Sequence, residues 1–169
     1  MKSKIKIFIW LPALLMMVII FRFSTADGEQ SSGLSLGLTQ HIVDTVICAV
    51  NIEMTPEEEL SFIELIHTPI RKLGYLSEYG MLAVTVVFPL YAYHRKRRWK
   101  LFIWCEGICI FYAGSDEFHQ LFVPERSGQL RDVLIDSTGI TLGLLFFFLC
   151  LKIFHNHLSR RLNDPLKTE

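Results

Sequence analysis

The chain has 169 residues, which fits one domain and leaves little room for two. Hydrophobic residues make up 51% of it and the formal net charge is zero, so a general electrostatic attraction to nucleic acid is excluded. The apolar residues come in long runs between short charged segments, a distribution that predicts an integral membrane protein.

The first apolar run, residues 5–23, begins among three lysines, at positions 2, 4 and 6, and contains Arg22 near its end. At about 1.5 Å per residue, a helix of this length just spans a hydrocarbon core of about 30 Å. The alternative is a signal peptide, which would be cleaved within residues 24–26. Because Arg22 fits poorly beside such a cleavage site, we favour a retained transmembrane helix.

Residues 24–70 are more polar, with eight acidic residues and no Lys or Arg. The Ser- and Gly-rich segment 24–37 predicts turns. Apolar residues at helical spacing predict a short amphipathic helix over residues 41–50. A second short helix is expected to begin at Thr55, with Pro56 in its first turn and Glu58 completing a capping box. Both helices would lie on the membrane surface or cover the bundle.

Three more segments predict transmembrane helices, at residues 73–93, about 101–122 and 132–154. The apolar part of the middle one ends near Tyr112, which is too short to cross alone. The polar residues after Tyr112 would therefore lie at membrane depth or at the interface. We thus predict an all-α bundle of four transmembrane helices that forms one domain over residues 1–169.

The basic residues predict the orientation of this bundle. The N-terminus, the segment 94–100 and the C-terminal tail hold 12 of the 17 Lys and Arg residues. Cytoplasmic segments collect Lys and Arg, so both termini are expected in the cytoplasm of a bacterium, with the protein in its plasma membrane. The other five basic residues fall at the non-cytoplasmic helix ends: Arg22, Arg71, Lys72, Arg126 and Arg131.

Acidic residues gather at the same helix ends and are expected to pair with these bases. Glu78 follows Lys72 in the second span, and Asp132 and Asp136 lie one turn apart in the fourth. Gly139 and Gly143 continue the face of Asp136 in a small-xxx-small pattern, so Asp136 should face a neighbouring helix. The predicted binding residues of this site are Arg22, Ser24, Arg71, Lys72, Glu78, Gln120, Arg126, Arg131, Asp132 and Asp136.

Three residues near the end of the third span are candidates for catalysis. His119 could transfer protons near neutral pH, with Asp116 or Glu117 orienting it. Glu106 lies earlier on the same helix, near mid-membrane, where a carboxyl group should be protonated or face a polar partner. The alternative is that these charges form a buried ion-pair network that only fixes the bundle.

Other site chemistry is less well supported by the sequence. The spacing of Asp116, Glu117 and His119 matches no established zinc pattern, so no metal or other cofactor is predicted. No hydroxyl nucleophile motif is present, and the four cysteines contain no CxxC pair and are interpreted as small buried hydrophobes. His155 and His157 are interpreted as solvated tail residues.

Three motifs resemble the VanZ-like family and together run from about residue 21 to residue 143. The longest is the sequence SDEFHQLFVPERSGQLRDVLID at residues 115–136. Residues 71–72 with 78–79 resemble the second motif, and residues 23–24 with Ser32 and Ser35 resemble a looser first motif. Tyr75 stands where the family often has His, and Ala26 where it often has Gln.

The resemblance implies a small bacterial envelope protein, whose name-giving relative is linked to low-level resistance to the glycopeptide teicoplanin. With the charged residues, it favours a polar outer-face pocket that binds or modifies an anionic lipid-linked or cell-wall precursor. Whether the protein is an enzyme is left open. The alternatives are a purely structural or interaction protein whose charges fix the bundle, and a small proton-coupled transporter. Membrane lipid is the other expected partner, and the oligomeric state is not predicted.

Overall fold

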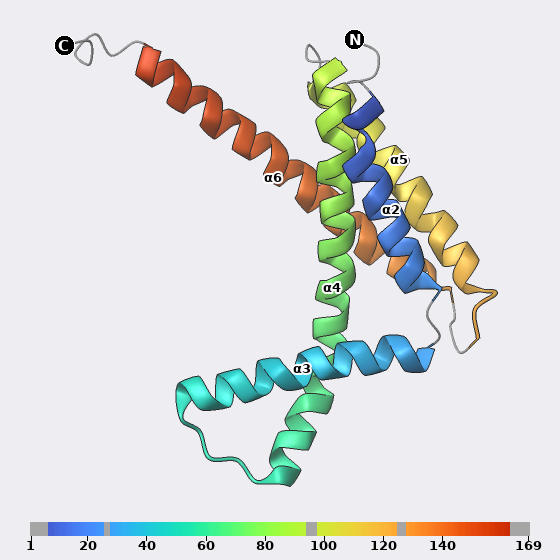
Figure 1. Cartoon of the computed structure of the whole chain (residues 1–169), viewed down its shortest axis with the longest axis vertical. Coiled ribbons are helices and arrows are strands. Elements are labelled where there is room, and N and C mark those ends of the chain that lie inside the picture. The colour runs from blue at the N-terminus through green and yellow to red at the C-terminus, as the bar shows by residue number, and fades with distance from the viewer. Residues whose placement is uncertain (1–6, 26–27, 94–97, 125–127, 163–169) are drawn as a thin grey trace.

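The structure is a computed structural model that describes residues 7–25, 28–93, 98–124 and 128–162. All regular elements in these ranges are α-helices, which confirms the predicted fold class. They are α2 (Leu11–Ser24), α3 (Gly28–Val50), α4 (Pro56–Tyr93), α5 (Arg98–Gln120) and α6 (Leu130–Leu162). Figure 1 shows α2, α4, α5 and α6 gathered in one bundle, with α3 lying across one end of α4.

Two helices among the described residues are long and apolar enough to cross a membrane. Their spans are Pro56–Tyr93, with a mean hydropathy of 1.4, and Leu130–His157, with a mean hydropathy of 2.0. Helix α2 has 14 residues, fewer than the roughly 20 that a complete crossing needs. The four crossings expected from the sequence therefore stay a prediction.

The helices of the bundle alternate in direction along the chain. The start of α2, the end of α4 and the start of α5 lie together at one end of the bundle in Figure 1, and α6 ends on the same side but well away from them. The end of α2, the end of α5 and the start of α6 lie at the opposite end. This arrangement is the one that successive crossings would produce, and it brings the polar ends of three helices together.

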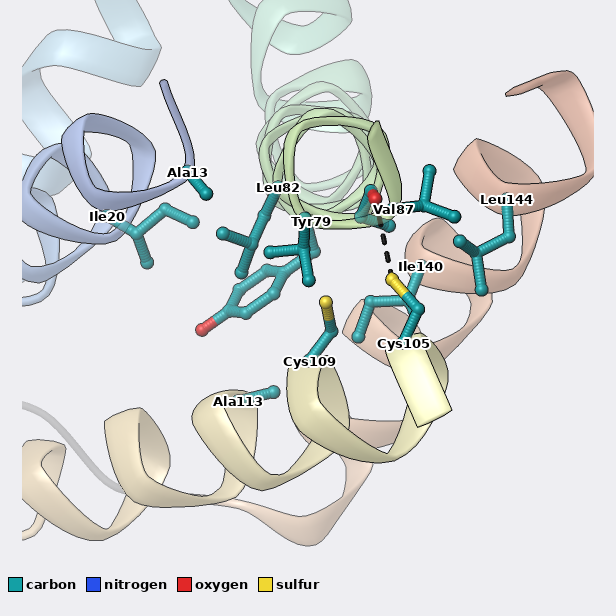
Figure 2. Close-up of a cluster of buried hydrophobic side chains, with 12 residues drawn as sticks. Ala13, Ile20, Tyr79, Leu82, Val87, Cys105, Cys109, Ala113, Ile140 and Leu144 are labelled. Carbon is teal, nitrogen blue, oxygen red and sulfur yellow. Dashed lines mark hydrogen bonds between the residues drawn. The ribbon is translucent and has the colours of Figure 1, made fainter. Parts of the chain in front are cut away.

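The core of the bundle receives apolar side chains from all four helices (Figure 2). Helix α4 contributes more of them than any other helix and lies between α2 and α6 in this view. Two cysteines of α5 belong to the core, and the Sγ of Cys105 donates to the carbonyl oxygen of Ala83 at 3.6 Å. Cys105 and Cys109 are buried free thiols, whereas Cys48 and Cys150 are exposed.

Helices α4 and α6 pack most extensively, and glycines bring their backbones close together. A Cβ atom at Gly139 would collide with the carbonyl oxygen of Leu76, and one at Gly143 with that of Gly80. A Cβ atom at Gly80 would lie 3.2 Å from the carbonyl oxygen of Gly139. The small-xxx-small pattern therefore forms the expected helix contact, with α4 as its partner.

The segment between the first two predicted spans differs from the prediction. The expected turns over residues 24–37 are wrong from Gly28 onward, because α3 is a helix of 23 residues. The hydroxyls of Ser35 and Thr39 donate to carbonyl oxygens three and four residues earlier, at 3.1 and 2.8 Å. Polar side chains that often favour turns are thus accommodated on a helix surface.

The second short helix is likewise not a separate element. Helix α4 runs for 38 residues from the predicted cap into the membrane span and includes Pro69 and Pro89. Neither proline ends the helix, which membrane helices tolerate. One of the two predicted short helices is therefore an extension of a span.

Both ends of the α3–α4 connection show specific caps. Asn51 adopts a positive φ of 55°, and the Ile52 N–H donates to the carbonyl oxygen of Ile47 at 3.2 Å, which ends α3 in a Schellman motif. The predicted capping box is confirmed, because the Thr55 N–H donates to Glu58 at 2.9 Å and the Glu58 N–H donates to the Thr55 hydroxyl at 3.3 Å. The backbone N–H and the hydroxyl of Thr55 both donate to the Glu58 carboxylate, and they hold its pKa below the usual range.

Candidate functional site

Polar side chains from four helices meet where the ends of α2 and α5 approach α4 and the start of α6. Asp116 is at the centre and interacts with Ser24 of α2, Tyr79 of α4, and His119 and Gln120 of α5. Asp136 of α6 interacts electrostatically with Asp116 and Glu117. These seven residues are called the polar cluster: Ser24, Tyr79, Asp116, Glu117, His119, Gln120 and Asp136.

The polar cluster is largely withdrawn from the molecular surface. Ser24, Tyr79 and Asp136 each expose 3% of their area, and Asp116 exposes 6%. Burying carboxyl groups among apolar helices is costly, and such groups usually mark a functional site in a membrane protein. The sequence expectation that Asp136 faces a neighbouring helix is confirmed by its burial.

Asp116 is held by its own helix on one side only. The Nε2 group of Gln120 donates to its Oδ2 atom at 3.3 Å, across one turn of α5. Its Oδ1 atom is buried and has no hydrogen-bond partner among the described residues. One carboxylate oxygen is thus held by Gln120, and the side chains of Ser24 and Tyr79 interact with the same carboxylate from α2 and α4.

Three side chains near Asp116 also carry buried polar atoms. The Ser24 hydroxyl, the Tyr79 hydroxyl and the Nε2 atom of His119 are also buried without a hydrogen-bond partner in the described part of the chain. Each such group costs about 1–3 kcal/mol when it is left unsatisfied, so a native structure that retains four together needs a reason. Water, a bound polar group or proton-transfer chemistry would supply one.

His119 occupies the open edge of the polar cluster. It is half-buried, and its ring lies 5.0 Å from the ring of Phe21 in α2, tilted by 31°. Two exposed aromatic residues close to His119 in the chain, Phe118 and Phe122, stack edge to face with ring centroids 5.4 Å apart. The imidazole therefore lies at the border between the buried carboxylate and an apolar outer surface.

Glu117 anchors the connection between α5 and α6. Its Oε2 atom accepts a hydrogen bond from the Gln129 backbone N–H at 2.9 Å. Gly128 packs so closely on this turn that a Cβ atom there would collide with the carbonyl oxygen of Glu117. A local structural role thus accompanies the catalytic role predicted for Glu117.

Several acidic side chains approach one another at this end of the bundle. Asp136 interacts electrostatically with Glu117, Asp132, Asp116 and Glu78, named from the largest effect to the smallest. Even so, no group of three or more His, Cys, Asp or Glu residues in the described ranges is arranged to hold a metal ion. Because these acids lie close together, ionising all of them at once has a higher electrostatic cost.

The predicted basic partners are placed differently from the acids. Arg22 and Arg131 are exposed, and Arg71 and Lys72 are half-buried. The Nε atom of Arg71 is buried without a hydrogen-bond partner among the described residues. Arg126 lies outside the described residues, as does Ala26.

The sequence analysis missed two tyrosines of this region. Tyr79 joins the core and the polar cluster, and its ring lies 6.5 Å from that of Tyr112. Tyr112 ties α5 to α2, because its hydroxyl donates to the carbonyl oxygen of Met17 at 2.6 Å. The position of Tyr79 directly after Glu78 in the second motif was the sequence signal that could have identified it. Tyr75, the departure from the family pattern, is half-buried on α4.

Glu106 has the polar partner that its depth in the bundle requires. The hydroxyl of Thr141 in α6 donates to its Oε1 atom at 2.8 Å, and both side chains are partly buried. Thr141 also donates to the carbonyl oxygen of Ser137 at 2.9 Å. The contact joins α5 and α6 deeper in the bundle than the polar cluster.

Thr141→Val is expected to lower the stability of the bundle by removing this partner. An unsatisfied carboxyl group in apolar surroundings costs about 1–3 kcal/mol. The check is a double-mutant cycle of melting temperatures in detergent, in which Thr141→Val should have little effect once Glu106 is replaced by Leu. Equal effects of Thr141→Val in both backgrounds would show that the hydrogen bond contributes nothing.

The comparisons with known proteins bear on most of the chain. The model of one protein family, described as VanZ/LLP1, matches residues 8–152. No curated protein and no solved structure matches the chain. The matched range includes the whole polar cluster and the glycine contact between α4 and α6.

Proposed function

The chain belongs to the VanZ/LLP1 family of membrane proteins, and on this premise we propose that its polar cluster recognises the head group of an envelope lipid or lipid-linked cell-wall precursor. One observation carries the proposal. Ser24, Tyr79 and Asp116 come from the three separate motifs of the family resemblance, and they converge at one carboxylate. Ser24 and Asp116 lie near the ends of α2 and α5, and Tyr79 lies within α4, a candidate membrane span.

The polar atoms of the cluster suit a head group rich in hydroxyl groups. The Asp116 Oδ1 atom can only accept when the carboxyl group is ionised, while the hydroxyls of Ser24 and Tyr79 can donate and accept. Arg71 offers an additional unpartnered donor on α4 for an anionic part of the same molecule. Together these groups support the anionic precursor expected from the sequence.

His119 would decide whether recognition is followed by chemistry. A histidine beside a carboxylate can act as a general acid or base near neutral pH. In this proposal Asp116 interacts electrostatically with the imidazole of His119. A binding protein needs only the hydrogen bonds of His119, whereas an enzyme needs its proton transfer.

The location of the site follows from the charge bias of the sequence. The polar cluster lies at the end of the bundle opposite the start of α5, where Arg98 and Lys100 are found. With those residues in the cytoplasm, the cluster opens toward the outer face of the bacterial plasma membrane. Binding or modifying a precursor there would limit the access of a glycopeptide such as teicoplanin.

Mass spectrometry of copurified lipids tests this proposal. The wild type should retain one head-group class above its level in the host membrane, and Asp116→Asn and Tyr79→Phe should lose that enrichment. Asp116→Asn preserves the size of the side chain, and Tyr79→Phe removes only a hydroxyl group. Glu64→Gln on the exposed part of α4 is the matched control and should behave like the wild type.

The same preparations separate binding from a purely structural role. If the polar cluster only fixes the bundle, the variants should melt at lower temperature while their bound lipids match those of the wild type. Equal lipid composition in all four proteins would therefore refute the proposed site.

A further inference from the structure

Helix α3 has an apolar side that the rest of the protein does not cover. Leu38, Ile42 and Val46 expose 56%, 38% and 45% of their area, although they lie on a helix docked against α4. With Ala49, which is also exposed, they fall within an arc of about 80° at 100° per residue. These four residues are called the apolar flank of α3.

The opposite side of α3 is polar and exposed. Gln40, Asp44 and Cys48 follow one another at four-residue spacing, and His41 and Thr45 lie beside them. All five side chains are exposed. An apolar flank facing a polar one is the pattern of a helix that lies in the plane of a membrane interface.

The attachment of α3 fixes which of its sides are free. Thr39 and Val43 are fully buried, and they lie on the arc between the apolar flank and the polar flank. The hydroxyl of Ser35 is hydrogen-bonded to the Nε2 atom of His67 in α4 at 2.8 Å. Because this arc of α3 packs against α4, the apolar flank lies on one side of the α3–α4 contact and the polar flank lies on the other.

The position at which α3 contacts α4 agrees with a location of α3 at the membrane interface. His67 precedes Leu73, the expected start of the membrane span, by six residues, or about 9 Å of helix. Interfacial helices bury their apolar face about 5–10 Å into the boundary between head groups and acyl chains. Figure 1 shows α3 running across α4, so it lies roughly in the bilayer plane if α4 crosses the membrane.

We infer that α3 is an interfacial helix whose apolar flank is inserted into the lipid bilayer. Its apolar stretch, Ser35–Val50, is too short to cross a membrane, at about 24 Å. Asp44 is the only Asp, Glu, Lys or Arg in this stretch and lies on the polar flank. Insertion is therefore driven by apolar area and does not depend on anionic lipid.

Fluorescence quenching in vesicles tests this inference on the full chain. The exposed native thiols are first removed by Cys48→Ser and Cys150→Ser, and an environment-sensitive probe is then attached at Leu38→Cys or Val46→Cys. Gln40→Cys and Asp44→Cys are the matched controls on the polar flank. All four positions are exposed, so labelling them leaves the packed core intact.

In phosphatidylcholine vesicles, probes at 38 and 46 should be quenched by spin-labelled lipid and protected several-fold from iodide, relative to 40 and 44. Adding phosphatidylglycerol should change neither result. Equal iodide quenching at all four positions would overturn the inference. So would protection from iodide without quenching by lipid, which would indicate that protein, such as a second copy of this chain, covers the apolar flank. The proposed function makes no prediction for these probes.

Discussion

Gly139→Leu is expected to cause the largest loss of stability of any single substitution in the bundle. A Cβ atom at this position would already collide with the backbone of Leu76, and backbone cannot move aside as a flexible side chain can. Helices α4 and α6 would have to separate along the most extensive helix contact of the structure. Overpacking of this kind costs about 1–3 kcal/mol or more.

The measurement is the melting temperature in detergent, followed by the amount of protein that remains monodisperse after heating. Gly107→Leu is the matched control, because nothing lies within 4 Å of a Cβ atom at Gly107. It introduces the same side chain into a membrane helix without touching a neighbour. A Gly139→Leu protein as stable as Gly107→Leu would contradict the close α4–α6 crossing.

His119→Ala is expected to cause the largest loss of function while leaving the protein abundant. His119 is half-buried at the edge of the polar cluster, so its removal disturbs packing little beyond the contact with Phe21. In cells where the protein raises teicoplanin tolerance, the variant should return the inhibitory concentration to that of cells without the protein. Membrane levels of the protein, followed by immunoblot, should stay near those of the wild type.

Two further variants interpret that result. His119→Gln keeps a hydrogen-bonding side chain but cannot transfer protons as imidazole does, a contribution worth about 10²–10⁴-fold in typical enzymes. If His119→Gln restores teicoplanin tolerance, the role of His119 is in binding. If tolerance is still lost, its role is in catalysis. His155→Ala, in the exposed end of α6, is the control. A fall in abundance that fully accounts for lost tolerance in His119→Ala would instead support a structural role.

Much of the fold could be predicted from the sequence because apolar runs and caps are local signals. Thr55 and Glu58 lie within one turn, so their capping box could be identified before its geometry was known. The glycine pair in α6 indicated a close helix contact for the same reason. That Gly80 and Leu76 form the other side depends on how α4 and α6 pack, which no local pattern encodes.

The extent of α3 and α4 could not be predicted as readily. Ser and Gly content indicated turns near residue 33, yet tertiary contacts decide the outcome there. Ser35 bonds to His67 from another helix, and Thr39 and Val43 are buried by packing. Helix propensities differ by roughly a few tenths to one kcal/mol per residue, and such packing outweighs them.

The candidate site was predicted in part. Asp116, Glu117, Gln120 and Asp136 were identified from charge placed at membrane helix ends, and the structure brings them close together. Pairing with arginines was expected on electrostatic grounds and stays a prediction, because sequence spacing does not tell which way a side chain turns at a helix end. Tyr79 was missed because a tyrosine in an apolar run resembles any other core residue.

Helix α4 connects α3 with the polar cluster, and Pro69 lies between the two. A proline has no N–H, so the carbonyl oxygen of Leu65 lacks its usual partner within the helix and the backbone can hinge at this point. Changes in bilayer curvature or thickness that tilt α3 would then be absorbed at this joint. Such a hinge would insulate the geometry around Asp116 from movements of α3.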